Sequence, residues 1–151
     1  MPIGTAGFKI QKIFTSSTSF TKKYSFYSDS SCSTKTGHIK YGYTNIIVNP
    51  AAVTVTAGST PTRPDRAYQV KYTKLNVISK GNTPYAVSFL YTFVGNTHTS
   101  GDEQTNPASG LIYDIWATEV SGGNTWLYSA WNPSITGYPT DWSSQDDISF
   151  K

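Results

Sequence analysis

The chain has a single cysteine and few charged residues. Cys32 has no second cysteine to pair with, so an intramolecular disulfide is excluded, as is a Cys-x-x-Cys or Cys/His zinc motif. Charged residues make up 14% of the chain, and the net charge of +3 is too small to indicate a nucleic-acid partner. The length of 151 residues suits one domain over residues 1–151, with a core that needs no metal or disulfide.

Long apolar stretches are also missing. No run approaches the roughly 18 apolar residues that a membrane-spanning helix needs. The first ten residues lack the basic and apolar segments of a signal peptide. We therefore expect no membrane span, and a soluble chain that is either the mature form of a secreted or extracellular protein or a cytoplasmic protein.

Aromatic residues, in contrast, make up 15% of the chain, and many of them lie two positions apart or at multiples of two. The series comprises Phe20, Tyr24, Phe26, Tyr41, Tyr43, Tyr68, Tyr72, Tyr85, Phe89, Tyr91 and Phe93. A period of two places alternate side chains on one face of a β-strand. Together with the abundant Ser, Thr, Asn and Gly, this pattern predicts an all-β protein with less than about a tenth of its residues in helices.

The expected strands lie between turn-forming residues. They cover residues 8–14, 20–28, 38–48, 53–56, 67–79, 85–94, 111–120, 124–131 and 148–150. Gly81-Asn82 and Gly122-Gly123 are expected to turn two hairpins, and residues 58–66 and 95–110 to form loops. Because closure removes exposed sheet edges, we predict a single antiparallel lipocalin-like β-barrel of about eight or nine strands, with a β-sandwich as second choice.

A small barrel holds either packed side chains or one small ligand. Tyrosine suits a ligand site because its ring is apolar and its hydroxyl can bond to a polar head group. We therefore predict that the chain binds an apolar or amphipathic small molecule, such as a lipid, isoprenoid or pigment. The expected lining residues are Tyr24, Phe26, Tyr41, Tyr43, Tyr72, Phe89, Tyr91, Trp116 and Trp126. The alternatives are that these rings fill a packed core, or that an outer apolar patch joins copies into a homo-oligomer.

A second hypothesis is a lectin-like carbohydrate site near the C-terminus. Aromatic rings stack on sugar faces, and neighbouring polar side chains bond to sugar hydroxyls. The candidate residues are Trp131, Asn132, Tyr138, Asp141 and Trp142. The alternative role of Trp131 and Trp142 is to plug one end of the barrel.

Catalysis has little support in the sequence. Cys32 and His38 are close enough in sequence to form a Cys/His pair, but no orienting group or oxyanion site accompanies them. His98, Asp102 and Glu103 contain metal-ligating atoms, although carboxylates near a loop histidine are usually only solvated. We therefore expect no enzyme activity, no metal and no cofactor.

Three segments resemble one known family. Residues 22–46, KKYSFYSDSSCSTKTGHIKYGYTNI, are similar to the strand, Tyr-x-Asp-x-x-Cys turn and strand of the adenomatosis polyposis coli down-regulated family. Residues 64–78 resemble its tyrosine strand, and residues 138–150 resemble its closing Pro-Thr segment and last strand. The resemblance implies an extracellular lipocalin-like barrel that binds a lipid or another elongated apolar molecule without catalysis. The chain departs from the pattern because Cys32 has no partner upstream and the Trp-containing opening is missing.

Overall fold

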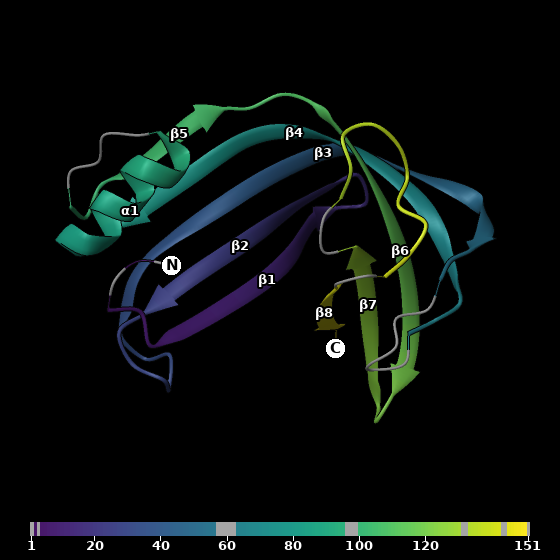
Figure 1. Cartoon of the computed structure of the whole chain (residues 1–151), viewed down its shortest axis with the longest axis horizontal. Coiled ribbons are helices and arrows are strands. Elements are labelled where there is room, and N and C mark those ends of the chain that lie inside the picture. Colours follow the sequence, from purple (N-terminus) through teal and green to yellow (C-terminus); the bar gives the residue numbers. More distant parts are fainter. Residues whose placement is uncertain are drawn as a thin grey trace. The chain divides into compact units, whose positions relative to one another are not determined.

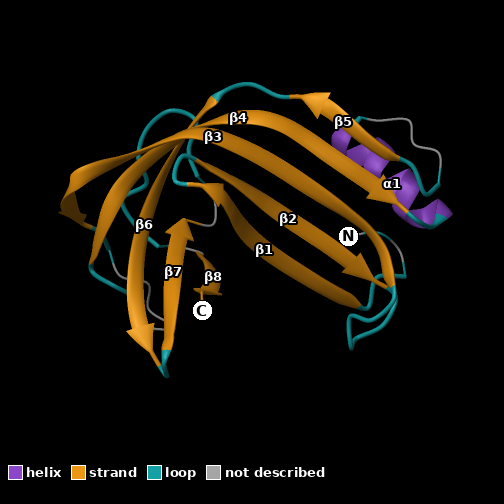
Figure 2. Ribbon diagram, turned by 180° about the vertical axis from the view of Figure 1, so that it is seen from behind, coloured by secondary structure: helices purple, strands orange, loops and turns teal. Residues whose placement is uncertain are grey.

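The structure is a computed structural model that describes residue 2 and residues 4–56, 63–95, 100–130, 133–142 and 145–150. For Phe93 and residues 145–150 it describes the backbone alone. Strands dominate this part of the chain and one helix accompanies them (Figures 1 and 2). No helix among the described residues is long and apolar enough to cross a membrane.

Eight strands of the described residues form one sheet, and their pairings β1–β2, β2–β3, β4–β5, β4–β6, β6–β7 and β7–β8 are antiparallel. They are β1 (Gly7–Ser16), β2 (Ser19–Tyr27), β3 (Lys35–Thr54), β4 (Arg66–Gly81), β5 (Glu103–Pro107), β6 (Leu111–Ser121), β7 (Asn124–Ala130) and β8 (Gln145–Phe150). Their order is β1-β2-β3-β4-β6-β7-β8, and β5 pairs with β4 beside this path. The all-β prediction is confirmed. In the described part of the chain no ladder joins β1 to β8, so closure into a barrel is not confirmed.

The chain divides into two compact units. The first unit comprises Met1–Tyr43 and Lys74–Ser109, and the second comprises Thr44–Thr73 and Gly110–Lys151. Both β3 and β4 therefore contribute residues to each unit.

β3 continues through a proline that was expected to interrupt it. The two strands predicted at residues 38–48 and 53–56 are one strand of 20 residues, and the predicted break at Asn49-Pro50 is wrong. β2 pairs with β3 only as far as Tyr43, so Pro50 lies where β3 no longer has β2 beside it. A proline is tolerated at such a sheet edge because the ladder needs no N–H donor there.

The strand predicted at residues 85–94 is an α-helix, α1 (Pro84–Val94), so the hairpin predicted at Gly81-Asn82 is also wrong. Thr83 caps the helix by accepting a hydrogen bond from the N–H of Ala86 at 3.2 Å, and Pro84 occupies the first turn. Gly95 ends the helix with a φ of 72°. The helix has 11 residues, so the expected low helix content is confirmed for the described chain.

α1 packs on one face of the first unit, beside β5 and the end of β4 (Figures 1 and 2). Ala86 and Leu90 are buried, four positions apart on the helix. Two glycines allow this close approach. A Cβ on Gly37 would lie 2.7 Å from the carbonyl oxygen of Lys80, and a Cβ on Gly81 would lie 2.8 Å from the backbone nitrogen of Val87.

The hairpin predicted at Gly122-Gly123 is confirmed. Ser121 and Asn124 face each other in the β6–β7 ladder, and both glycines have positive φ values, 59° and 76°, as a type I′ turn requires. The loop predicted at residues 95–110 is partly wrong, because it contains β5. That strand pairs with residues 76–80 of β4.

Candidate functional site

Alternation along β1, β2 and β3 collects aromatic side chains on one face of the first unit. The ladders align four rungs: Phe8–Phe26–Gly37, Ile10–Tyr24–Ile39, Lys12–Lys22–Tyr41 and Phe14–Phe20–Tyr43. We call the side of the strands that carries these residues the aromatic face. Four of the predicted lining residues, Tyr24, Phe26, Tyr41 and Tyr43, lie on it.

Rings on the aromatic face contact one another along and across the strands. Phe8 lies 5.7 Å from Phe26 and 6.0 Å from Tyr24, measured between ring centroids. Phe20 stacks on Tyr43 at 4.7 Å, and Phe14 lies 5.6 Å from Phe20. Such offset and tilted pairs add about 0.5–1.5 kcal/mol each beyond the burial of their surface. The face thus carries two groups of contacting rings, one around Phe8, Tyr24 and Phe26 and one around Phe14, Phe20 and Tyr43.

α1 covers one end of the aromatic face. Phe89 packs edge-on against Phe26 at 5.5 Å, and Leu90 is buried with Phe26 and Ile39. These rings therefore belong to a packed core, one of the three roles expected for them. Tyr91 is 58% exposed on the helix, so the expectation that it lines an interior strand face is wrong.

The other part of the aromatic face combines exposed rings with lysines. Phe8 and Phe14 are 39% and 38% exposed. The ammonium of Lys22 lies 5.4 Å from the centre of the Tyr24 ring, and that of Lys12 lies 5.2 Å from the Phe20 ring. Burial raises the pKa of the Tyr41 hydroxyl and Tyr24 raises it further, whereas Lys22 opposes the change. Apolar area and positive charge therefore lie side by side.

The remaining three predicted lining residues lie in the second unit. Tyr72 and Trp116 are neighbours, with ring centroids 6.0 Å apart. The Tyr72 hydroxyl and the Trp116 indole N–H both donate to Oδ2 of Asp114, at 3.0 and 2.7 Å. Trp126 packs against the core of this unit, and its indole N–H donates to the Ser121 carbonyl oxygen at 3.3 Å. Tyr72 and Trp116 thus anchor a buried carboxylate.

Trp142 is a core residue of the second unit. It is completely buried, packs with Val55 and Tyr128, and donates its indole N–H to the carbonyl oxygen of Pro64 at 2.7 Å. It is therefore unavailable for stacking on a sugar, and its predicted sugar-binding role is corrected to a packing role. Trp131 and Asn132 lie outside the described residues.

The other two sugar-site candidates line a shallow hollow of about 380 Å³. Its lining residues are Ser134, Thr136, Gly137, Tyr138, Pro139, Thr140 and Asp141. The Tyr138 ring packs edge-on against Tyr113 at 5.0 Å. The hollow offers hydroxyl groups, one carboxylate and one aromatic ring.

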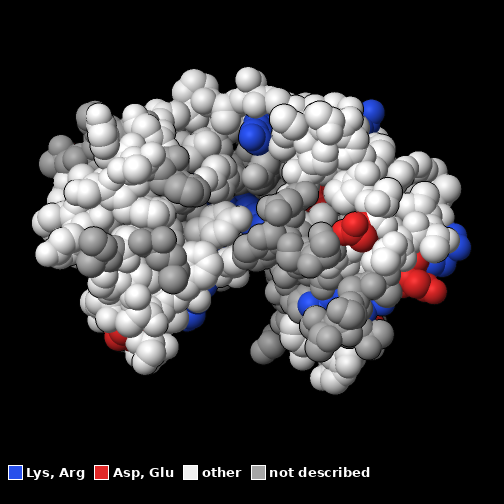
Figure 3. Space-filling view, in the orientation of Figure 1, with Lys and Arg blue, Asp and Glu red and all other residues white. Residues whose placement is uncertain are grey.

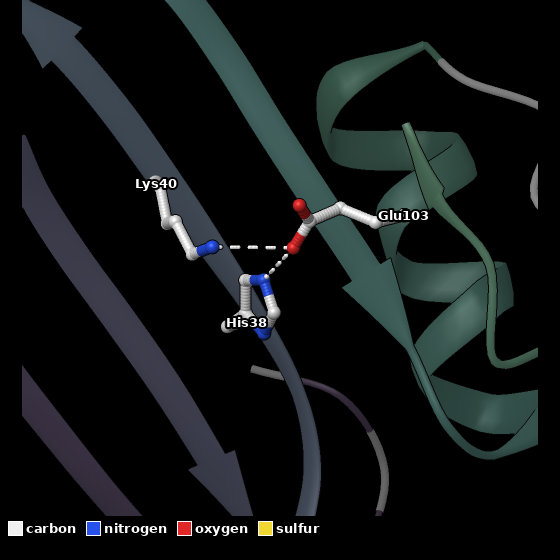
Figure 4. Close-up of polar contacts among 3 residues, drawn as sticks. All are labelled: His38, Lys40 and Glu103. Carbon is white, nitrogen blue, oxygen red and sulfur yellow. Dashed lines mark hydrogen bonds and ion pairs between the residues drawn. The ribbon is translucent and has the colours of Figure 1, made fainter. Parts of the chain in front are cut away.

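A polar cluster lies on the side of β3 opposite the aromatic face (Figure 4). Glu103 Oε2 accepts hydrogen bonds from His38 Nε2 at 2.9 Å and from Lys40 Nζ at 3.2 Å. Burial lowers the pKa of His38 to about 4, and the bond to Glu103 opposes this change. The His38 bond in turn lowers the pKa of Glu103. His38 is thus neutral near pH 7.

This cluster differs from both arrangements considered for its residues. His38 bonds to Glu103 and not to Cys32, whose sulfur lies beside Gly7 on β1. His98, the proposed metal-binding neighbour of Glu103, lies outside the described residues. The His38–Glu103 contact joins positions 65 residues apart, which no local motif indicates.

Charged side chains are otherwise sparse in the view of Figure 3, where separate blue and red areas interrupt a mainly white surface. The aromatic face holds four of the predicted lining residues, the largest group of them that the structure brings together.

No protein-family model matches the chain, and no curated protein matches it.

Proposed function

We propose that the chain binds an amphipathic small molecule, with an apolar body and an acidic head group, against the aromatic face of β1–β3. A lipid, an isoprenoid or a pigment with a carboxylate has this character. The resemblance to the adenomatosis polyposis coli down-regulated family supports the same ligand class.

The observation that carries the proposal is the rung Lys12–Lys22–Tyr41 between rungs of aromatic and aliphatic residues. Lysines are seldom fully buried unless their charge is paired, and here the ammonium groups of Lys12 and Lys22 lie over the Phe20 and Tyr24 rings within the aromatic face. Lys22 and Tyr41 are partly exposed, so both remain within reach of a ligand. Exposed Phe8 and Phe14 supply apolar area on either side of this rung.

Enclosure of the ligand inside a barrel is a further part of the proposal. Enclosure requires β1 to pair with β8, and the described residues form no ladder between these two strands. Binding against the aromatic face does not depend on that closure, because all four rungs lie on β1, β2 and β3.

Fluorescence titration with two related probes tests the proposal. Retinoic acid carries a carboxylate and retinol carries a hydroxyl on the same apolar body. We expect both to bind saturably, and Lys22→Gln to weaken the acid about three- to fivefold while leaving the alcohol unchanged, as loss of a partly exposed ion pair requires. Phe14→Ala should weaken both probes.

Lys71→Gln is the matched control, since it removes the same charge from β4 outside the aromatic face. It should leave both affinities unchanged. If neither probe binds the wild-type protein, or if Lys71→Gln and Lys22→Gln act equally, the proposed site is wrong.

A carbohydrate site at the hollow of residues 134–141 is a second candidate function. The observation that favours it is the polar lining around Tyr138, whose ring is only partly buried. Saturable binding in a glycan screen that is lost in Tyr138→Ala and retained in Lys22→Gln would support it. Loss in Lys22→Gln alone would instead assign the binding to the aromatic face.

A further inference from the structure

Positive charge is concentrated in the first unit. Its sequence contains eight lysines and three acidic residues, whereas the second unit contains four basic and six acidic residues. The modest net charge of the whole chain conceals this difference. The first unit therefore has an excess of cations that requires a physical explanation.

Three of these lysines lie together on the side of β2 and β3 opposite the aromatic face. Lys23 and Lys40 are directly opposite each other in the β2–β3 ladder. Lys35 lies opposite Tyr27 in the same ladder. On β2, Tyr27 is two residues from Ser25 and four from Lys23, so these three positions lie on the same side of the strand. We call Lys23, Lys35 and Lys40 the lysine cluster. All three are partly buried, so their charges are incompletely screened by water.

The charges of the cluster act on one another. Burial lowers the pKa of Lys35, and the positive charges of Lys23 and Lys40 and a side-chain contact with Lys23 lower it further. Like charges directly opposite each other in a sheet are destabilising. The cluster therefore stores repulsion that an anion placed among the three ammonium groups would relieve.

Neighbouring acidic groups compensate this charge only in part. Glu103 contacts Lys40 and His38, and it is the acidic residue that opposes the lowered pKa of Lys35. Asp29, the other acidic residue near Lys35 in sequence, accepts hydrogen bonds from Ser31, Ser33 and Thr34 within its own turn. One carboxylate thus faces three lysines, which leaves an excess of about two positive charges.

Buried polar groups beside the cluster are suited to a hydrogen-bonding ligand. Ser25 faces His38 in the ladder next to the Lys23–Lys40 pair, and both residues are buried. His38 Nδ1 and Thr36 Oγ1 are buried without a hydrogen-bond partner. The Thr36 hydroxyl can donate to an anion or to an ordered water, whereas Nδ1 of the neutral His38 is an acceptor, because Nε2 carries the proton that bonds to Glu103, and it suits an ordered water.

We propose that the lysine cluster, together with Ser25, binds a doubly charged oxyanion of the phosphate or sulfate type. Such an anion matches the excess charge and accepts several hydrogen bonds from ammonium and hydroxyl donors. The site lies on the opposite side of β2 and β3 from the aromatic face, so it is independent of the function proposed above.

NMR titration of the ¹⁵N-labelled full chain tests this site. The probes are inorganic phosphate at pH 7.5 and sulfate, with nitrate as a singly charged comparison, all at constant ionic strength. We expect saturable shifts of the amides of Lys23, Ser25, Lys35 and Lys40 with both dianions, with a dissociation constant of about 1 to 10 mM. Nitrate should bind at least about tenfold more weakly, since it carries half the charge.

Paired variants separate the site from a general effect of charge. Lys23→Gln/Lys35→Gln should weaken phosphate binding at least about tenfold, whereas Lys71→Gln/Lys74→Gln, which removes the same charge from β4, should change it less than about twofold. Glu103→Gln should strengthen binding about three- to tenfold, because it removes the competing carboxylate.

Several results would overturn the proposal. They are the absence of saturable shifts at the cluster with both dianions, equal weakening by the two double variants, and weaker binding by Glu103→Gln. If Lys23→Gln/Lys35→Gln fails to give a folded amide spectrum, Lys35→Gln and Glu103→Gln retain the test, because their effects must have opposite signs.

Discussion

Trp116 donates its indole N–H to Asp114 at 2.7 Å, from a position two residues further along β6. Asp114 is completely buried and also accepts hydrogen bonds from the Tyr72 hydroxyl at 3.0 Å and from the backbone N–H of Ala130 at 2.9 Å. Its carboxylate thus receives donors from β4, β6 and β7. A buried carboxylate is tolerated where hydrogen bonds replace its lost hydration.

Asp114→Asn is expected to lower the free energy of unfolding by about 2 to 4 kcal/mol, because the NH₂ group that replaces Oδ2 cannot accept the bonds that Trp116 and Tyr72 now donate there. Urea denaturation measures this change. Asp65→Asn is the matched control, since Asp65 is exposed, and it should shift stability by less than about 0.5 kcal/mol. Equal effects of the two substitutions would show that the network contributes nothing specific.

The second prediction concerns acid stability. His38 has a pKa of about 4 in the folded chain against 6.5 ordinarily, so the unfolded state binds more protons between these values. The free energy of unfolding should therefore fall as the pH drops from 6.5 toward 4, by about 1 to 2 kcal/mol at pH 5. The lowered pKa of Glu103 adds a loss in the same direction below its ordinary value of 4.5.

His38→Gln isolates the histidine contribution. Glutamine retains a donor for Glu103 but does not titrate, so the decrease between pH 6.5 and pH 5 should become smaller. Thermal or urea unfolding at a series of pH values measures this. An unchanged pH profile in His38→Gln would assign the acid sensitivity to other groups.

The third prediction concerns the packing of α1. Leu90 is completely buried and its neighbour Tyr91 is 58% exposed. Leu90→Ala should destabilise the chain by about 2–5 kcal/mol through lost packing and a cavity. Tyr91→Ala should change stability by less than about 0.5 kcal/mol. Chemical denaturation of both variants decides the matter, and similar losses at the two positions would contradict the observed orientation of the helix.

The fourth prediction concerns Cys32. With one thiol in the chain, a reducing agent should leave the stability of the monomer unchanged, as thermal unfolding with and without dithiothreitol will show. Gly7→Ala should cost about 1–3 kcal/mol by overpacking, because its Cβ would overlap the backbone carbonyl oxygen of Asp29 and lie 2.7 Å from Cys32 Sγ. An even oligomer that dissociates on reduction would instead show that Cys32 links two chains.

Most strands could be predicted because alternation and turn residues coincide. The Gly122-Gly123 hairpin is the clearest case, since both positions need a positive φ that glycine adopts at little cost. The sequence also contains residues that indicate the two ends of the helix, because Thr83-Pro84 is typical of a helix start and Gly95 of a helix end. Its aromatic residues Tyr85, Phe89 and Phe93 are four apart, a spacing that fits a helical face as well as a strand.

Other features depend on contacts that the local sequence does not encode. β5 consists mainly of polar residues without apolar alternation, and it is a strand because β4 offers it a partner. Asp114 appears in the sequence as one acid between Tyr113 and Ile115, and its donors come from three strands. The lysine cluster is not evident from the sequence, because Lys22 and Lys23 are adjacent there although their side chains lie on opposite sides of β2, and Lys35 and Lys40 join Lys23 only through the β2–β3 ladder.

The division of the chain into units has a consequence for its dissection. The boundaries fall after Tyr43, Thr73 and Ser109, so the chain passes from one unit to the other three times. A fragment ending at Ser109 would lack β6, the partner of residues 68–73 in β4. No single cut therefore separates the residues of one unit from those of the other, and a cut at Ser109 leaves residues 68–73 of β4 without β6. Gene fragments of this protein should accordingly yield unfolded products, and the intact chain should unfold in one cooperative transition.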